Sequence, residues 1–203
     1  KLWREEMSPG ARLTYVSVEA YPLERHEMVR AHAPYRSLAD LSRELRQNLP
    51  PPLSGYHEVR LDNGRARLLL LYGQVREMLA GLGARADAWL LDGFAPAKNP
   101  AMWTPEILEM IGQLSKPGAR LATFTVAGDV RRGLETAGFS VQKRPGYGSK
   151  RECLTGTMVQ KRSVKHKLPW LALPKPVTEK SDAVVVGAGI AGCCLARTLS
   201  DDG

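Results

Sequence analysis

The sequence has no long apolar run and little cysteine. No stretch of the 203 residues approaches the length of a membrane-spanning helix, and the opening Lys-Leu-Trp-Arg-Glu-Glu has no apolar signal-peptide core. The three cysteines, Cys153 and the adjacent Cys193 and Cys194, lack the spacing of metal ligands, and their odd number argues against a disulfide framework. These absences predict a cytoplasmic protein with buried thiols, no metal and no membrane partner.

Positive charge is abundant and unevenly placed. The net charge is +8, and hydrophobic residues make up 43% of the sequence, as in an ordinary globular protein. Between residues 143 and 167, eight basic residues stand against the single acid Glu152, which leaves +7 in this segment. Such a cluster suits a polyphosphate partner, because each neutralised phosphate releases counterions. A solvated linker without a binding role is the alternative.

Segments typical of strands and helices alternate along most of the chain. Strands are predicted at 12–18, 57–61, 65–72, 88–91, 120–125, 139–143 and 152–158, and helices at 23–33, 38–49, 75–82, 104–114 and 130–137. Asp62-Asn63-Gly64 between two of the strands is a strong hairpin signal. The alternation predicts an α/β fold, a parallel sheet with helices on both faces that ends in an antiparallel hairpin.

Two acidic residues follow predicted strands directly. The apolar run at 88–91 predicts a strand buried on both faces, with a buried helix as the alternative, and it stops at Asp92-Gly93. Because open α/β sheets bind ligands at the carboxyl ends of their strands, Asp92 is a candidate functional carboxylate. Glu19 ends the first predicted strand, where an acid commonly binds ribose hydroxyls. A turn residue and a surface carboxylate, respectively, are the alternatives.

A glycine-rich signature lies near the end of the sequence. The segment 161–180 is basic, contains three prolines and is predicted to be a linker. It leads into an apolar strand and then Gly187, Gly189 and Gly192 in the pattern G-x-G-x-x-G, which lets the backbone approach a pyrophosphate at a helix N-terminus. The segment 181–203 therefore predicts the beginning of a dinucleotide-binding domain, for either FAD or NAD.

Several motifs, taken together, resemble one bacterial family. They are Leu91-Asp92-Gly93-Phe94-Ala95-Pro96-Ala97-Lys98-Asn99-Pro100 with Met102-Trp103, Leu121-Ala122-Thr123-Phe124-Thr125, Val130-Arg131-Arg132-Gly133-Leu134, Ala137-Gly138-Phe139 and Gln142-Lys143-Arg144. Over residues 12–160 the chain resembles the bifunctional tRNA 5-methylaminomethyl-2-thiouridine biosynthesis proteins. The resemblance implies a Rossmann-like class I methyltransferase domain at 1–160, whose first strand and glycine loop would precede Lys1. The segment 181–203 would be the first strand, turn and helix of an FAD-dependent oxidoreductase domain.

The resemblance also implies an activity and a partner. In this family the FAD-dependent domain removes the carboxymethyl group from 5-carboxymethylaminomethyluridine at the tRNA wobble position, and the other domain methylates the exposed amine with S-adenosylmethionine. By analogy Asp92 would accept a proton or hydrogen bond from the amine and orient it, and Phe94 would stack on the base. The residues expected to contact tRNA phosphates are Lys98, Lys143, Arg144, Lys150 and Arg151.

The implied cofactors are S-adenosylmethionine and FAD. Glu19 would bind the ribose hydroxyls of S-adenosylmethionine and Gln74 its adenine amino group, while the three fingerprint glycines would bind FAD. Gln74 departs from the family pattern, in which an aspartate is expected, and an amide accepts without charge assistance. Because the implied first strand and glycine loop would precede Lys1, the chain alone is expected to bind the methyl donor poorly and to be inactive. The alternatives are a tRNA-binding module without catalysis and a protein that is principally an FAD or NAD oxidoreductase.

Overall fold

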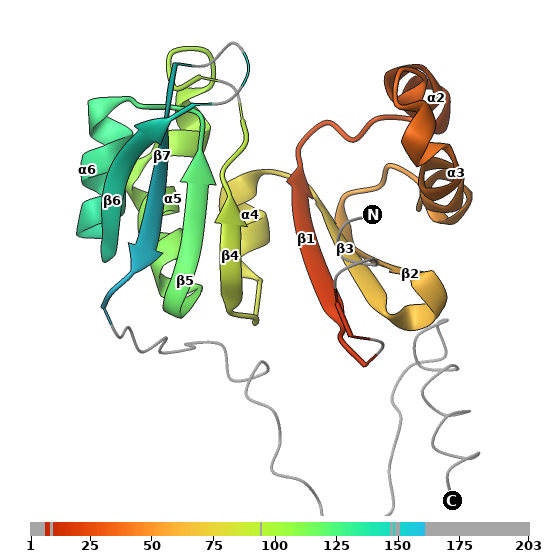
Figure 1. The fold of residues 1–203 in the computed structure, drawn as a ribbon, viewed down its shortest axis with the longest axis horizontal. Coiled ribbons are helices and arrows are strands. Elements are labelled where there is room, and N and C mark those ends of the chain that lie inside the picture. The colour runs from red at the N-terminus through yellow and green to blue at the C-terminus, as the bar shows by residue number, and fades with distance from the viewer. Residues whose placement is uncertain (1–6, 9, 94, 147, 149–150, 161–203) are drawn as a thin grey trace, which may run out of the picture. The chain divides into compact units, whose positions relative to one another are not determined.

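The computed structural model describes residues 7–8, 10–93, 95–146, 148 and 151–160. They belong to the first of two compact units, Lys1–Val164, and none belongs to the second, Lys165–Gly203. The predicted FAD-binding segment at 181–203, with its three glycines, and the predicted linker at 161–180 therefore lie outside the described residues, as do Phe94 and Lys150. The first unit is drawn in colour in Figure 1.

Strands and helices alternate in the order that the sequence predicts. The strands are β1 (Leu13–Glu19), β2 (Gly55–Leu61), β3 (Ala66–Tyr72), β4 (Ala86–Leu90), β5 (Ser115–Thr123), β6 (Phe139–Pro145) and β7 (Glu152–Met158). The α-helices are α2 (Arg25–His32), α3 (Ala39–Asn48), α4 (Val75–Ala80), α5 (Pro105–Gln113) and α6 (Gly128–Thr136), and the 3-10 turns are η1 (Arg36–Leu38), η2 (Asp62–Gly64) and η3 (Pro100–Trp103). The predicted α/β class is confirmed, and the run at 88–91 contributes to a strand, not a helix.

The described strands form two sheets, whereas the alternation predicted one. In the first, of order β1-β3-β2, β1 runs parallel to β3 and β2 antiparallel to it. In the second, of order β4-β5-β7-β6, β4 and β5 are parallel and β7 is antiparallel to β5 and β6. The predicted terminal hairpin is thus confirmed as β6–β7. The separation falls between β1 and β4, each of which is paired along one edge only among the described residues (Figure 1).

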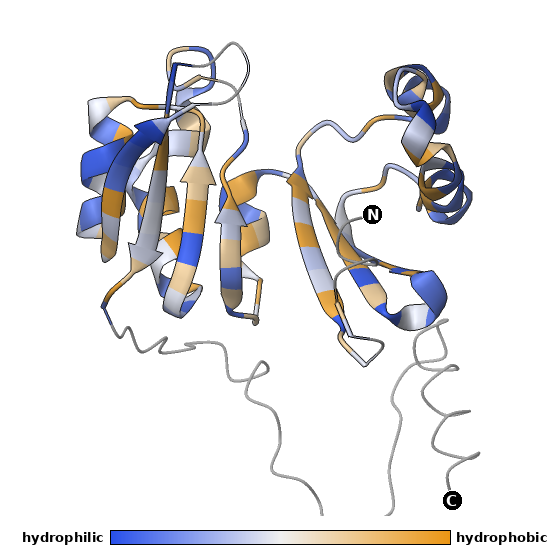
Figure 2. Ribbon diagram, viewed as in Figure 1, coloured by the Kyte–Doolittle hydropathy of each residue, from blue (hydrophilic) through white to orange (hydrophobic). Residues whose placement is uncertain are grey.

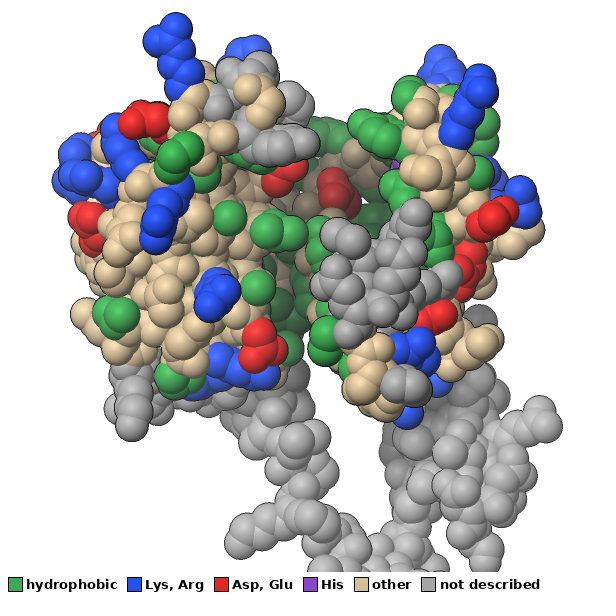
Figure 3. All heavy atoms as spheres, in the orientation of Figure 1, with side chains coloured by type: hydrophobic (Ala, Val, Ile, Leu, Met, Phe, Trp, Pro, Cys, Tyr) green, Lys and Arg blue, Asp and Glu red, His purple; other side chains and the backbone are tan. Residues whose placement is uncertain are grey.

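The main core lies between the second sheet and its helices. Its buried members on α5, α6, β6 and β7 include Ile107, Leu108, Val130, Leu134, Phe139 and Met158. A Cβ on Gly133 would lie 2.3 Å from Leu108 Cδ1, so a glycine is needed where α6 packs on α5. The opposite face of this sheet is not covered by a described helix, and Figure 3 shows backbone and uncharged side chains there with scattered Lys and Arg side chains. The expectation of helices on both faces is therefore wrong for the described residues.

Helix α4 links the two sheets. Its Leu79 belongs to the main core, while Tyr56 on β2 donates a hydrogen bond of 2.7 Å to the carbonyl of Met78. Arg76 Nε lies 2.9 Å from both carboxylate oxygens of Glu106 on α5, and this hydrogen bond lowers the pKa of Glu106. Because the Arg76–Glu106 pair is exposed, it contributes little to the stability of the fold, and its main effect is to hold α4 against α5.

Two expectations about burial are wrong. The strand at 88–91 was predicted to be buried on both faces, but Leu90 is 69% exposed because β4 is an edge strand with one uncovered face (Figure 2). Cys153 was expected to be buried, but it is only partly so, because it lies at the start of β7 beside Pro145. The other two cysteines lie outside the described residues.

Helix α5 begins with a cap that can be tested. Thr104 Oγ1 accepts a 3.4 Å hydrogen bond from the backbone N–H of Ile107, and Pro105 occupies the first turn, as predicted. Thr104→Ala is expected to lower the free energy of unfolding by about 1 kcal/mol, measured by urea denaturation, because that N–H loses its partner. Thr104→Ser, which keeps the hydroxyl, should remain near the original stability; an equal loss in both variants would show that the cap is not responsible.

Candidate functional site at the carboxyl ends of the strands

Glu19 and Gln74 meet at the carboxyl edge of the first sheet. Glu19 is the last residue of β1 and is opposite Tyr72, the last residue of the parallel strand β3. The backbone N–H of Gly73 then donates to the carbonyl of Glu19 at 3.0 Å, so the two strands end together. Gly73 has a φ of 155°, a backbone conformation that other residues rarely adopt, which explains why the chain turns here on a glycine. Gln74 follows as the exposed residue before α4.

The Glu19 carboxylate is exposed and held by a neighbour. Its Oε1 accepts a hydrogen bond of 2.8 Å from Ser17 Oγ, two residues earlier on the same face of β1. Burial raises the pKa of Tyr72, and the negative charge of Glu19 raises it further, which places the two side chains within electrostatic reach. A carboxylate fixed in this way at a strand end is suited to accept hydrogen bonds from a pair of hydroxyls. Ser17 was not predicted, because a serine inside a β-branched run carries no distinguishing signal.

Asp92 lies on a loop that folds back on itself. The N–H of Leu91 donates to the carbonyl of Ala122 at 2.9 Å and keeps the chain on β5 up to the residue before Asp92, whose side chain is exposed. The Met102 side chain reaches back to Gly93, where a Cβ would lie 2.7 Å from Met102 Cε, so the two ends of the loop lie close together. Trp103 packs against the main core and anchors the far end. Asp92 is thus a solvent-accessible carboxylate that directly follows a residue hydrogen-bonded to β5.

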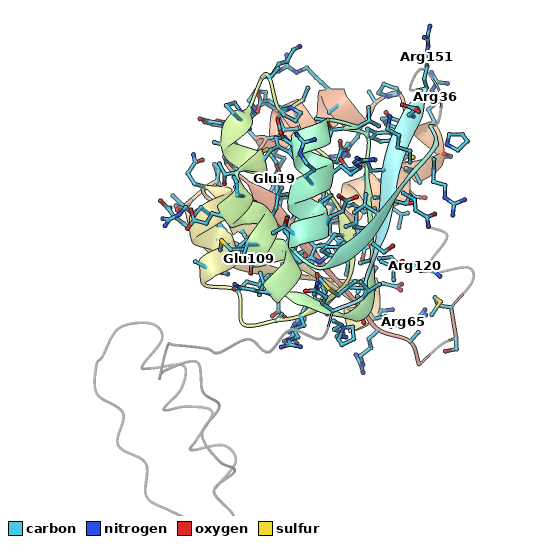
Figure 4. All side chains as sticks on the ribbon, turned by 90° about the vertical axis from the view of Figure 1, so that its left-hand side faces the viewer. Glu19, Arg36, Arg65, Glu109, Arg120 and Arg151 are labelled. Atoms are coloured by element: carbon cyan, nitrogen blue, oxygen red, sulfur yellow. The ribbon has the colours of Figure 1, made fainter. Side chains whose placement is uncertain are left out.

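The described basic candidates lie at the same edge of the second sheet. Because β6 runs antiparallel to β7, and β7 antiparallel to β5, β6 ends beside the carboxyl ends of β4 and β5. Lys143 and Arg144 near the end of β6 and Arg151 just before β7 therefore share this edge with Asp92, and Arg151 projects from the hairpin in Figure 4. Lys98 is exposed within the Asp92 loop, in a turn closed by its N–H and the carbonyl of Ala95 at 2.7 Å.

Two of these cations already have polar partners. Lys143 Nζ lies 3.2 Å from Glu152 Oε2, and Arg144 donates to the side chain of Gln142 at 3.1 Å. Glu152, the one acid of the basic segment, thus offsets part of its charge. Both members of the Lys143–Glu152 pair are half exposed, so the pair is weak and can exchange for a phosphate.

Phe124 is a site residue that the sequence reasoning missed. It follows β5 directly, is 50% exposed and lies at the same edge as Asp92. The available signal was an aromatic residue near the end of the strand predicted at 120–125, a strand that in the structure ends at Thr123. Among the described residues, no group of three or more His, Cys, Asp or Glu side chains is arranged to hold a metal ion. The part of the chain that the structure describes also contains no helix long and apolar enough to cross a bilayer.

Two mixed sheets whose parallel strands are followed by exposed carboxylates define an α/β protein of the class that binds ligands at the carboxyl ends of its strands. Residues 36–159 match the model of a family described as S-adenosyl-L-methionine-dependent methyltransferase, and the chain belongs to this family. S-adenosylmethionine, predicted as the methyl donor, is thereby confirmed as the family's cofactor.

Comparison with individual proteins agrees with this family. The chain is 45% identical over 196 residues to the tRNA 5-methylaminomethyl-2-thiouridine biosynthesis bifunctional protein MnmC of Magnetococcus marinus, covering 96% of this chain and 29% of the relative. It is 47% identical to the protein of that name from Ectopseudomonas mendocina, covering 98% and 30%. The chain therefore spans under a third of the length of these relatives. The crystal structure of MNMC2 from Aquifex aeolicus has the same fold, with a TM-score of 0.59 at 24% identity over 80% of this chain and 49% of that one.

Proposed function

We propose that this chain is the methyltransferase part of a bifunctional tRNA-modifying enzyme. It transfers a methyl group from S-adenosylmethionine to the amine of 5-aminomethyl-(2-thio)uridine at the wobble position. The observation that carries the proposal is the exposed Asp92 at the end of β4, on a fixed loop and at the same sheet edge as a set of basic residues. The names of the relatives support the choice of substrate.

Asp92 prepares the amine for attack. An alkyl amine with a pKa near that of lysine, about 10.4, is mostly protonated at neutral pH and has no free electron pair. The Asp92 carboxylate accepts a hydrogen bond or the proton from this nitrogen and orients it. S-adenosylmethionine supplies a methyl group on a positively charged sulfur. As the new nitrogen–carbon bond forms and the sulfur–carbon bond breaks, the electron pair stays on sulfur and the amine proton leaves toward Asp92. Much of the acceleration then comes from positioning.

The remaining candidates bind the two substrates. Glu19 accepts hydrogen bonds from the ribose hydroxyls of the methyl donor, and Gln74 accepts one from the adenine amino group through its amide oxygen. Phe94, which lies outside the described residues, stacks on the base. The cations proposed to contact tRNA phosphates, and so to set the position of the RNA without reading its sequence, are Lys98, Lys143, Arg144, Lys150 and Arg151.

The proposal extends to the whole protein. The glycines Gly187, Gly189 and Gly192, outside the described residues, begin an FAD-dependent oxidoreductase domain that removes the carboxymethyl group and so provides the amine. The word "bifunctional" in the names of the relatives supports this second activity. The domains would be 1–160 and 181–203 onward, joined by the linker 161–180. Such an enzyme works in the cytoplasm, where tRNA is matured, and needs neither a metal nor a membrane.

One observation favours a second candidate, a tRNA-binding module without catalysis. Gln74 occupies the position at which the resemblance implies a carboxylate, so the adenine contact lacks charge assistance. The test is incubation of the chain, extended upstream by the strand and glycine loop that the resemblance implies, with tritiated S-adenosylmethionine and tRNA carrying 5-aminomethyluridine. Label in the wobble nucleoside supports methyl transfer. tRNA binding without label would favour the module.

The 203-residue chain alone is expected to bind S-adenosylmethionine poorly. No described strand joins β1 to β4, so the edges that carry Glu19 and Asp92 belong to separate sheets. A ligand that must contact both edges then loses the pre-organisation that lowers its binding cost. Isothermal titration calorimetry of the chain should show no saturation at micromolar ligand, and a micromolar dissociation constant would contradict this expectation. The extended protein is the matched control and should bind.

A further inference from the structure

The placement of Phe124 beside Asp92 is set by the register of two strands. In the parallel pair β4–β5, Leu90 is opposite Ala122, and the N–H of Leu91 donates to the carbonyl of Ala122 at 2.9 Å. Asp92 comes two residues after Leu90, and Phe124 comes two residues after Ala122. They therefore leave neighbouring strands at the same edge of the sheet.

The residues that lead up to Asp92 and Phe124 point alternately to the two sides of the sheet. Leu91 packs against the main core and Thr123 is 5% exposed, so these two side chains point toward the helices. Leu90 and Ala122, the preceding residues, line the uncovered face. Asp92 and Phe124 come two residues after Leu90 and Ala122, just past the ends of β4 and β5, and both are exposed at this edge of the sheet.

The backbone around Phe124 is fixed, although its ring is not packed away. The N–H of Thr125 donates to Thr123 Oγ1 at 3.3 Å, and the N–H of Ala127 donates to Thr125 Oγ1 at 3.4 Å. These two turns, each closed by a threonine hydroxyl, lead directly into α6. They leave Phe124 50% exposed to solvent. A single exposed apolar residue needs no explanation by itself. An aromatic ring on a fixed backbone next to the candidate catalytic carboxylate does suggest a flat ligand.

We propose that the Phe124 ring stacks on the pyrimidine base whose substituent reacts at Asp92. This inference rests on the proposed function and adds a substrate-positioning residue to it. A ring face offers sequence-tolerant stacking to a base taken out of its helix, while leaving the edge of the base free for the chemistry. The ring would thus set the distance from the base to the carboxylate, and it contacts neither a phosphate nor the methyl donor.

The experiment is a cycle of one protein change and one RNA change. Anticodon stem-loop RNA with uridine at the wobble position, and the same RNA with an abasic nucleotide there, are titrated against the 203-residue chain by fluorescence anisotropy. Phe124→Leu is expected to weaken binding of the uridine RNA by about 5- to 150-fold and to leave binding of the abasic RNA unchanged. Phe124→Trp should retain discrimination between the RNAs. Tyr35→Leu, at an aromatic residue that is 61% exposed between α2 and η1, is the matched control and should change neither affinity.

The outcomes separate this inference from the proposed function. Equal weakening of both RNAs by Phe124→Leu would overturn the stacking role, because the ring would then act through the fold or a phosphate contact. Equal binding of both RNAs by the unaltered chain would overturn it as well. The proposed function survives either result if the extended protein transfers label to the wobble nucleoside, and it fails separately if that protein transfers none.

Discussion

Asp92→Asn in the upstream-extended protein is expected to lower kcat for methyl transfer by about 10²- to 10⁴-fold, the range that a positioned acid–base group contributes. Asparagine has nearly the same shape as aspartate and can still hydrogen-bond, but it cannot take a proton from the amine. The KM for S-adenosylmethionine should stay within about twofold, because the lost interaction is with the attacking nitrogen only. The measurement is transfer of tritium to tRNA carrying 5-aminomethyluridine under saturating substrates.

The matched control is Asp87→Asn on the same strand. Asp87 lies toward the opposite end of β4, where it is exposed and pairs with Lys116 at 2.8 Å. The Asp87→Asn change removes one negative charge from the strand that leads to Asp92, and it should leave kcat unchanged. A pH profile adds a second readout, because the Asp92→Asn rate should rise steeply as alkaline pH deprotonates the amine without help. Equal activity of the two variants would show that Asp92 has no role in the chemistry.

The sequence alone was sufficient to predict where two of the strands end. A β-branched run that stops at Glu19, and an apolar run that stops at Asp92-Gly93, predicted two strand ends within a few residues of those observed. Asp62, Asn63 and Gly64 predicted a hairpin, and all three have the positive φ values, 54°, 52° and 79°, that such a turn requires. Local chemistry decides these features, so local sequence reveals them.

Features that depend on neighbouring strands were not predictable in this way. The run at 88–91 has the composition of a doubly buried strand, but composition does not say whether a second strand pairs with it, and Leu90 is exposed. Lys143 was counted as available charge, yet the β6–β7 register, in which Lys143 is opposite Leu154 and Pro145 is opposite Glu152, brings the lysine diagonally to Glu152. Phe124 became visible as a site residue only when the β4–β5 register placed it beside Asp92.

We expect Glu19 to make the second large contribution to the reaction. This contribution is to the binding of S-adenosylmethionine alone. Glu19→Gln in the upstream-extended protein should raise the KM for S-adenosylmethionine by about 10- to 150-fold, because hydrogen bonds to a charged group contribute about 1.5–3 kcal/mol. The amide keeps one acceptor and the length of the side chain, so the fold and the Ser17 contact are retained. Loss of ground-state binding leaves kcat at saturation within about twofold.

The same assay with a matched control decides whether that effect is specific. Glu77 is an exposed acid in the first turn of α4, close in sequence to Gln74, and Glu77→Gln removes one negative charge near the same edge. Its KM should stay within about twofold, since a charge that is only nearby is screened by salt over roughly 10 Å, whereas a direct hydrogen bond is not. A similar rise in both variants would mean that general electrostatics attracts the positively charged methyl donor. A fall in kcat with Glu19→Gln would instead mean that Glu19 also aligns the sulfur–carbon bond with the amine beside Asp92.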